Sequence, residues 1–143
     1  MPNNKFAPVV ILIFSTLSCS APVAPKINLP SQIADWHIIP SSQSCVAPVP
    51  PNLNNSLDAP KARQACTAQY SGIPNISVTL YDMPDSSTAF EAIQHWAQPP
   101  TGKGAFYKDK LFVIVESPST DLPTLARFAN ALKSALTRDP SEQ

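Results

Sequence analysis

The chain has 143 residues, with ten basic and ten acidic side chains and a formal net charge of zero. This length allows one domain, and a chain with balanced charge lacks the basic face that nucleic-acid binding requires. The charge balance therefore excludes a nucleic-acid partner. The most unusual feature of the composition is its high proline content, 17 residues in all.

The first 18 residues have the layout of an export signal. Met1 to Lys5 is polar with one positive charge, and Phe6 to Leu17 is predominantly apolar. Because a helix needs about 20 apolar residues to span a bilayer, this run is too short for a permanent transmembrane segment. The pattern predicts a signal peptide over residues 1–18 and an exported protein.

Small residues lead to a cysteine at the end of this segment. The sequence Thr16-Leu17-Ser18-Cys19 resembles the lipobox of bacterial lipoproteins, in which the cysteine becomes the lipid-modified first residue of the mature chain. The resemblance implies lipidation of Cys19 and attachment to a membrane through that N-terminal lipid. The alternative is ordinary cleavage, for example after Ser20, which releases a secreted protein.

The next stretch predicts an extended tether, over residues 19–64. It contains eight of the 17 prolines and few charges, so it buries little apolar surface and offers few backbone donors. Within it we expect one outlying ordered segment, at residues 36–39. The compact domain is predicted over residues 65–138.

The cysteine count supports lipidation. There are three cysteines, an odd number for a chain in an oxidising compartment. If Cys19 carries a lipid, Cys45 and Cys66 remain to form a disulfide. Closing a loop of about 20 residues contributes on the order of 3 kcal/mol by restricting the unfolded chain. The alternative leaves both residues as free thiols.

Two strands joined by a turn are predicted at the start of the domain. Residues 66–70 have strand-like composition and end at a Ser-Gly turn. Residues 76–81 alternate apolar and polar side chains, which places every second residue, beginning with Ile76, on one buried face. The intervening residues 72–75 then close a hairpin.

A helix is predicted from Asp85, whose carboxylate can cap the free amides of the first turn. Two prolines after Gln98 end it, because proline disfavours helical geometry in the residue before it. Apolar residues at helical spacing predict an inward-facing stripe of Ala89, Ile93, Trp96 and Ala97.

A second pair of strands and a last helix follow. Residues 105–107 and 111–115 predict the strands, and the continuous apolar run of the second suits a central strand buried on both faces. Asp121 can cap the last helix. The apolar stripe of that helix is the most regular in the chain and comprises Leu122, Leu125, Phe128, Ala129, Leu132 and Leu136.

This order of elements predicts an α+β fold, a small antiparallel sheet of about four to five strands with two helices packed on it. A domain of this size has a marginal core, so a disulfide between Cys45 and Cys66 would matter for its stability.

The sequence singles out no catalytic residue, no metal site and no cofactor site. His37 and His95 have no second ligand at metal spacing, and the three glycines form no phosphate-binding loop. The enzymatic alternative is a small hydrolase or thiol enzyme that pairs Cys45 or Cys66 with a histidine.

The aromatic residues support one binding hypothesis. If Trp36 is exposed together with Tyr107, the two side chains line a shallow surface for a ligand or partner. The alternative places Trp36 in the core, where it covers one end of the sheet.

Several short motifs recur in the order of a known family. They are Leu29-Pro30 with Ala34-Asp35-Trp36, then Tyr70-Ser71-Gly72, residues 76–83 with Ala89-Phe90, and residues 106–113. Together they resemble domain of unknown function 6599, an uncharacterised bacterial family of exported proteins, over roughly residues 29–137. The resemblance implies a compact α+β domain without an established activity, so it assigns no site residue.

These features predict an exported, lipid-anchored envelope protein, facing the periplasm, or a secreted one. We expect a non-enzymatic binding or interaction module whose partner is an envelope protein or a small ligand. Two alternatives stay open: a small periplasmic hydrolase or thiol enzyme, and a purely structural lipoprotein.

Overall fold

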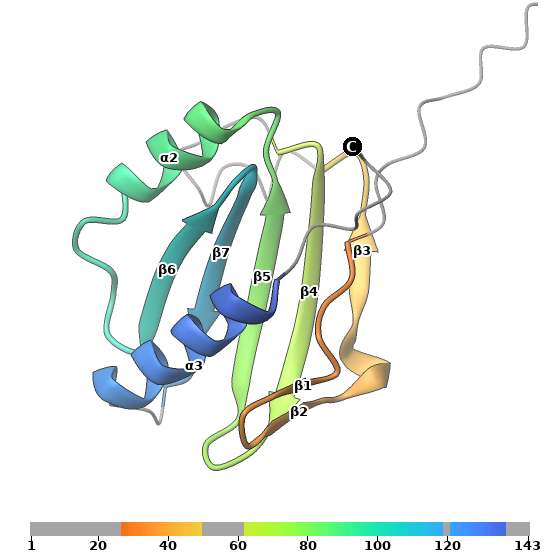
Figure 1. Ribbon diagram of the computed structural model, residues 1–143, viewed down its shortest axis with the longest axis vertical. Coiled ribbons are helices and arrows are strands. Elements are labelled where there is room, and N and C mark those ends of the chain that lie inside the picture. Colours follow the sequence, from red (N-terminus) through yellow and green to blue (C-terminus); the bar gives the residue numbers. More distant parts are fainter. Residues whose placement is uncertain (1–26, 50–61, 119–120, 137–143) are drawn as a thin grey trace, which may run out of the picture.

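The computed structural model describes residues 27–49, 62–118 and 121–136. They form one antiparallel sheet and two α-helices, so the predicted α+β class is confirmed (Figure 1). In chain order the elements are β1 (Gln32–Ile33), β2 (Trp36–Ile38), the 3₁₀ turn η1 (Pro40–Ser42), β3 (Ser44–Val46), β4 (Gln64–Ser71), β5 (Ile76–Asp82), α2 (Ser86–Gln94), β6 (Lys103–Lys108), β7 (Leu111–Glu116) and α3 (Leu122–Ala135).

The sheet has seven strands, more than the four to five that the sequence predicts. Its order is β1-β2-β4-β5-β7-β6, and β3 also pairs with β4. The additional strands β1, β2 and β3 come from the stretch that composition assigns to the tether. Each has only two or three residues, too few to show the alternation by which a strand is recognised in a sequence.

Residues 36–46 run along one edge of β4 as a strand that is interrupted once. β2 pairs with the end of β4 at Ser71, and β3 pairs with its beginning at Ala65. Between them lies η1, which begins at Pro40, since proline lacks the N–H that a paired strand needs. The outlying segment expected at residues 36–39 is therefore part of the sheet.

Both predicted hairpins are present. β4 pairs with β5 over seven residue pairs, and β6 pairs with β7 over six. β7 lies between β5 and β6, which confirms that it is a central strand. Its residues Phe112, Val113 and Val115 are fully buried, so both of its faces contribute to the interior.

The apolar side chains of the central strands point alternately to the two faces of the sheet and form two hydrophobic cores, one on each face. The first contains Val78 and Val113 with Phe128 of α3, and the second contains Phe112 with Ala92 of α2. Because neighbouring residues of a strand point to opposite faces, the two helices cover opposite sides of the sheet. Figure 1 shows α3 lying across the strands and α2 at one end of them.

Aspartate caps both helices, as predicted. Asp85 accepts a hydrogen bond from the backbone amide of Thr88 at 2.7 Å, and Asp121 accepts one from the amide of Thr124 at 2.9 Å. These bonds lower the pKa of both carboxyls. The pKa of Asp85 is lowered mainly by the hydrogen bond from the backbone amide of Thr88. The pKa of Asp121 is lowered mainly by the hydrogen bond from the side chain of Thr124.

α2 is shorter than predicted. It ends at Gln94 rather than Gln98, and Trp96 leaves the helical path to pack edge-on against Phe112, with ring centroids 6.3 Å apart. Ala97 is exposed as a consequence. The side chains that α2 buries fully are Ala89 and Ala92.

Candidate functional site

Trp36 lies inside the first core. Its side chain is 1% exposed, and its indole Nε1 donates a hydrogen bond to the carbonyl of Pro74 at 2.9 Å. The ring packs edge-on against Phe128, with centroids 5.3 Å apart. The guanidinium of Arg127 covers it from outside at 4.9 Å. Trp36 is therefore a core residue and offers no binding surface.

Tyr107 is half-buried on β6, on the opposite side of the sheet. Its ring contacts Phe90 of α2 with centroids 5.6 Å apart, and the ammonium of Lys133 lies 5.9 Å from the ring centroid. The surface expected for Trp36 and Tyr107 does not form, because the two side chains belong to different cores on opposite faces.

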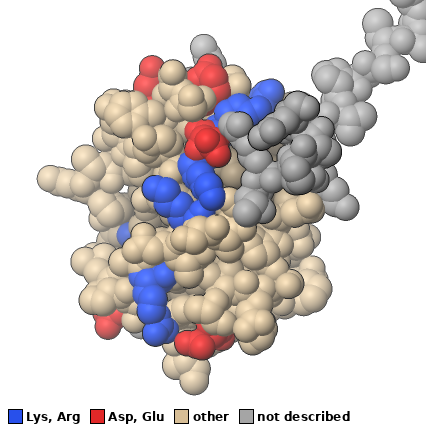
Figure 2. All heavy atoms as spheres, in the orientation of Figure 1, with Lys and Arg blue, Asp and Glu red and all other residues tan. Residues whose placement is uncertain are grey.

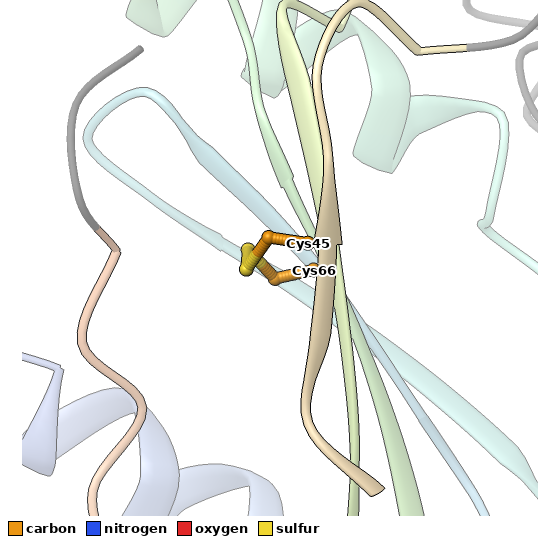
Figure 3. The surroundings of a disulfide bond; sticks show 2 residues. All are labelled: Cys45 and Cys66. Carbon is orange, nitrogen blue, oxygen red and sulfur yellow. A yellow bond between two sulfur atoms is a disulfide. The ribbon is translucent and has the colours of Figure 1, made fainter. Parts of the chain in front are cut away.

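The predicted disulfide joins Cys45 of β3 to Cys66 of β4 (Figure 3). The two residues lie directly opposite each other in the register, with Cα atoms 4.1 Å apart. Cys45 is exposed and Cys66 is fully buried. Since both sulfurs are bonded, the described residues hold no free thiol for a thiol enzyme. Cys19 lies outside the described residues.

His37 and His95 are both exposed. Within the described ranges neither histidine forms an ion pair with a carboxylate, and no three metal-ligating side chains come together there. No helix in those ranges is long and apolar enough to cross a membrane. On the face shown in Figure 2, acidic and basic side chains are both present, with uncharged residues between them. The candidate site is formed by the sheet instead.

A groove of about 490 Å³ crosses the sheet on the face that carries α2. α2 packs chiefly against β6 and β7, so among the described elements no helix lies over much of the same face of β3, β4 and β5. Thr67 is exposed and Thr79 is half-buried, although both lie on paired strands in the middle of the sheet. The groove therefore lies over central strands, where a second layer would normally cover the side chains.

Three hydroxyl side chains form a row on the floor of the groove. Ser44, Thr67 and Thr79 are cross-strand neighbours on β3, β4 and β5, so they recur at the spacing of adjacent strands, about 4.8 Å. None of the three hydroxyls has a hydrogen-bond partner within the described part of the chain. As far as the described residues are concerned, each can donate and accept hydrogen bonds to a ligand.

The groove is apolar along one side of this row. Two residues further along each strand the register aligns Val46, Ala65 and Tyr81. Trp96 forms a wall of the groove together with Pro100. The indole ring is half-buried and packs edge-on against Phe112, and it also lines the groove.

The opposite side of the groove is polar and carries an ion pair. Lys103 of β6 and Glu116 of β7 are cross-strand neighbours, and their Nζ and Oε2 atoms are 3.1 Å apart. Their side chains are 35% and 41% exposed, so solvent screens the pair and its stabilising effect is small. They are the charged residues that line the groove, and its lining has no net charge.

A second polar cluster lies where β4 begins and β5 ends. Arg63 contacts both carboxylate oxygens of Asp82, at 3.1 and 3.3 Å. Gln64 is the cross-strand neighbour of Asp82 and is buried, and its Oε1 has no hydrogen-bond partner within the described residues. The Asp82 side chain is only 4% exposed, so the Arg63 contact compensates its burial.

Comparisons of the chain with family models, with curated proteins and with solved structures give no match.

Proposed function

We propose that this chain is an exported envelope protein, anchored by a lipid on Cys19, whose folded domain is a binding module that holds its ligand or partner in the sheet groove. The observation that carries the proposal is the groove itself, which exposes over central strands a row of hydroxyls that have no hydrogen-bond partner among the described residues. A purely structural domain gains stability by covering such strands, whereas a binding module keeps them accessible.

Two features support export. The disulfide between Cys45 and Cys66 is of the kind that persists in an oxidising compartment. Pairing these two cysteines leaves Cys19 as the odd one of three, at the end of the apolar N-terminal segment.

The geometry favours binding over catalysis. A hydrolase needs a nucleophile or activated water with a base in hydrogen-bond reach. Among the described residues that line the groove there are hydroxyls but no histidine, and the one carboxylate among them, Glu116, is paired with Lys103. Such a set of groups can hold a ligand without activating it.

Lipidation of Cys19 is tested by its replacement with serine. In a bacterial host, the wild-type chain should incorporate labelled palmitate and sediment with membranes, and Cys19→Ser should do neither. Ser20→Ala serves as the matched control and should behave like the wild type. Mass spectrometry that finds an unmodified Cys19 in the mature wild-type chain would overturn the anchor.

Binding in the groove is tested by a photo-reactive amino acid placed in intact cells. At Thr67, on the floor of the groove, it should give a reproducible adduct in the mass spectrum or on a gel. Ser134 is an exposed position on α3 and serves as the control, where that adduct should be absent. Equal adducts at both positions, or none at either, would contradict the proposed site.

A further inference from the structure

We infer that the groove recognises a neutral saccharide, with one face of a sugar ring on Trp96 and the sugar hydroxyls on the row formed by Ser44, Thr67 and Thr79. The inference rests on the proposed function and names the chemical class of its ligand. It follows from four properties of the groove: its aromatic wall, its hydroxyls that have no partner among the described residues, its charge balance and its position on a sheet face.

The aromatic wall matches the apolar face of a sugar ring. Trp96 is half-buried, and its edge-on packing against Phe112 holds the indole ring in place before any ligand arrives. An aromatic side chain with little freedom left gives contact area at a low cost in conformational entropy. Pro100 also lines the groove, and its ring restricts its backbone angle φ. This part of the site is thus formed in advance.

The hydroxyl row matches the other groups of a sugar. Ser44, Thr67 and Thr79 each carry one donor and two acceptor lone pairs, and none is used within the described residues. A sugar hydroxyl has the same dual character, so each pair can bond in either direction. A ligand that covered these three groups without bonding them would lose hydrogen bonds to water that nothing replaces.

The charge balance favours a neutral ligand. Lys103 and Glu116 neutralise each other across 3.1 Å, so an ionic ligand would have to compete with an ion pair that already exists. A sugar hydroxyl can instead accept a bond from Lys103 and donate one to Glu116, and charge-assisted bonds of this kind are stronger than neutral ones. The polar side of the groove therefore suits a neutral, hydroxyl-rich molecule.

Two other ligand classes fit less well. An acyl chain would cover the hydroxyl row without offering a single hydrogen bond. An extended peptide binds most strongly by adding a strand to a free sheet edge. β4 and β5 each have strands paired on both sides, so their backbone groups are already used. The volume of about 490 Å³ lies within the range of small-ligand sites, roughly 300–1,000 Å³.

The test uses the purified full-length chain with two disaccharides as probes, maltose and diacetylchitobiose. Saturation-transfer NMR and tryptophan fluorescence should show saturable binding of at least one of them. Trp96 is one of only two tryptophans, and Trp36 is 1% exposed, so a ligand-dependent change in fluorescence reports on Trp96. In Trp96→Phe the fluorescence change should vanish.

Hydroxyl deletions locate the site. Thr67→Val and Thr79→Val should each weaken saccharide binding about fivefold to tenfold, the value of one hydrogen bond, while valine preserves strand propensity. Ser77→Ala is the matched control. It removes a hydroxyl from the same face of β5, outside the lining of the groove, and should leave the affinity unchanged. Near-ultraviolet circular dichroism verifies that each variant is folded.

Three results would overturn the inference. They are the absence of saturable binding of either disaccharide up to about 50 mM, equal binding by the threonine variants and the wild type, and binding of an acyl chain, probed with dodecanoate, that is retained in Thr79→Val while neither disaccharide binds. If the disaccharides fail but the Thr67 photo-adduct forms in cells, the saccharide inference falls and the binding module stands. If both fail, the proposed function falls as well.

Discussion

Phe128 connects more of the first core than any other single side chain described above. It is fully buried, and its ring lies 5.3 Å from the ring centroids of both Trp36 and Tyr70. Phe128→Ala should lower the free energy of unfolding by about 3–5 kcal/mol, because the cavity removes apolar contacts that the neighbours cannot restore. Urea denaturation followed by circular dichroism measures the loss.

Leu122 supplies the control for this substitution within the same helix. The sequence predicts it as part of the buried stripe, but it is 67% exposed. Leu122→Ala should therefore change the free energy of unfolding by less than about 0.5 kcal/mol. Similar losses at Leu122 and Phe128 would mean that α3 does not pack through the face described here.

Gly72 is required by a close approach rather than by its backbone angles. A Cβ atom at this position would lie 2.4 Å from Cδ1 of the Trp36 ring, which is itself held by surrounding side chains. Gly72→Ala should cost about 1–3 kcal/mol of stability through overpacking and should shift the fluorescence maximum of Trp36.

Gly104→Ala is the control substitution for Gly72→Ala. Its Cβ would meet Cγ2 of Val115 at 3.3 Å, a contact that a small shift of a side chain relieves. The expected loss is below about 1 kcal/mol. If Gly104→Ala proved as costly as Gly72→Ala, the close contact between Gly72 and Trp36 would not be the cause.

At the scale of elements, the N-terminal caps make helix stability depend on pH. The hydrogen bonds of Asp121 lower the pKa of its carboxyl below the ordinary value of 3.8. A group whose pKa is lower in the folded state stabilises the fold above its unfolded pKa. The contribution is lost as the pH falls through the folded value. Between pH 6 and pH 3, Asp121→Asn should therefore lose less stability than the wild type.

This comparison is made by thermal unfolding at a series of pH values. Asparagine keeps the capping oxygen but cannot ionise, so Asp121→Asn isolates the titration from the cap. A steeper profile in Asp121→Asn would contradict the assignment of the cap.

The C-terminal end of α3 is capped by a side chain from β6. Nζ of Lys108 on β6 donates hydrogen bonds to the carbonyl oxygens of Lys133, at 2.9 Å, and of Leu136. These carbonyls have no intrahelical partner. Such a cap cannot be recognised in a sequence, because Lys108 is separated from Lys133 by 25 residues.

At the scale of the whole molecule, the disulfide links residues 27–49 to the rest of the sheet through the bond between Cys45 of β3 and Cys66 of β4. Residues 27–49 contribute Leu29, Ile33 and Trp36 to the first core, yet they have only short strands to hold them. Replacing Cys45 and Cys66 together by alanine should lower the free energy of unfolding by about 3 kcal/mol. Amide hydrogen exchange should accelerate most in β1, β2 and β3.

Reduction of the wild type supplies the independent control for this prediction. A reducing agent should accelerate exchange in the same three strands, because it breaks the same link without changing a side chain. β5 and β7, which pair with each other on the far side of β4, should be less affected. Uniform acceleration across the sheet would show that residues 27–49 and the central strands unfold as one unit.

Prediction from the sequence succeeded where the determining interactions are local. The alternation from Ile76 to Tyr81 identifies a strand and its buried face, and the carboxylates of Asp85 and Asp121 identify the helix starts. The same alternation sends Ser77 and Thr79 to the other face of the sheet, which was the one available signal for the groove. It could not show that this face stays open.

The sequence by itself determined the α+β class, the two hairpins and both helix caps, because each depends on periodicity or on a cap within three residues. It left Cys45 and Cys66 either paired or as free thiols, and the structure shows the bond. Only the tertiary structure decided that Trp36 is buried, that α2 and α3 lie on opposite faces, and that Thr67 and Thr79 form a groove. Those outcomes depend on contacts between residues far apart in the chain, such as the hydrogen bond from Trp36 to Pro74. No local pattern encodes such contacts.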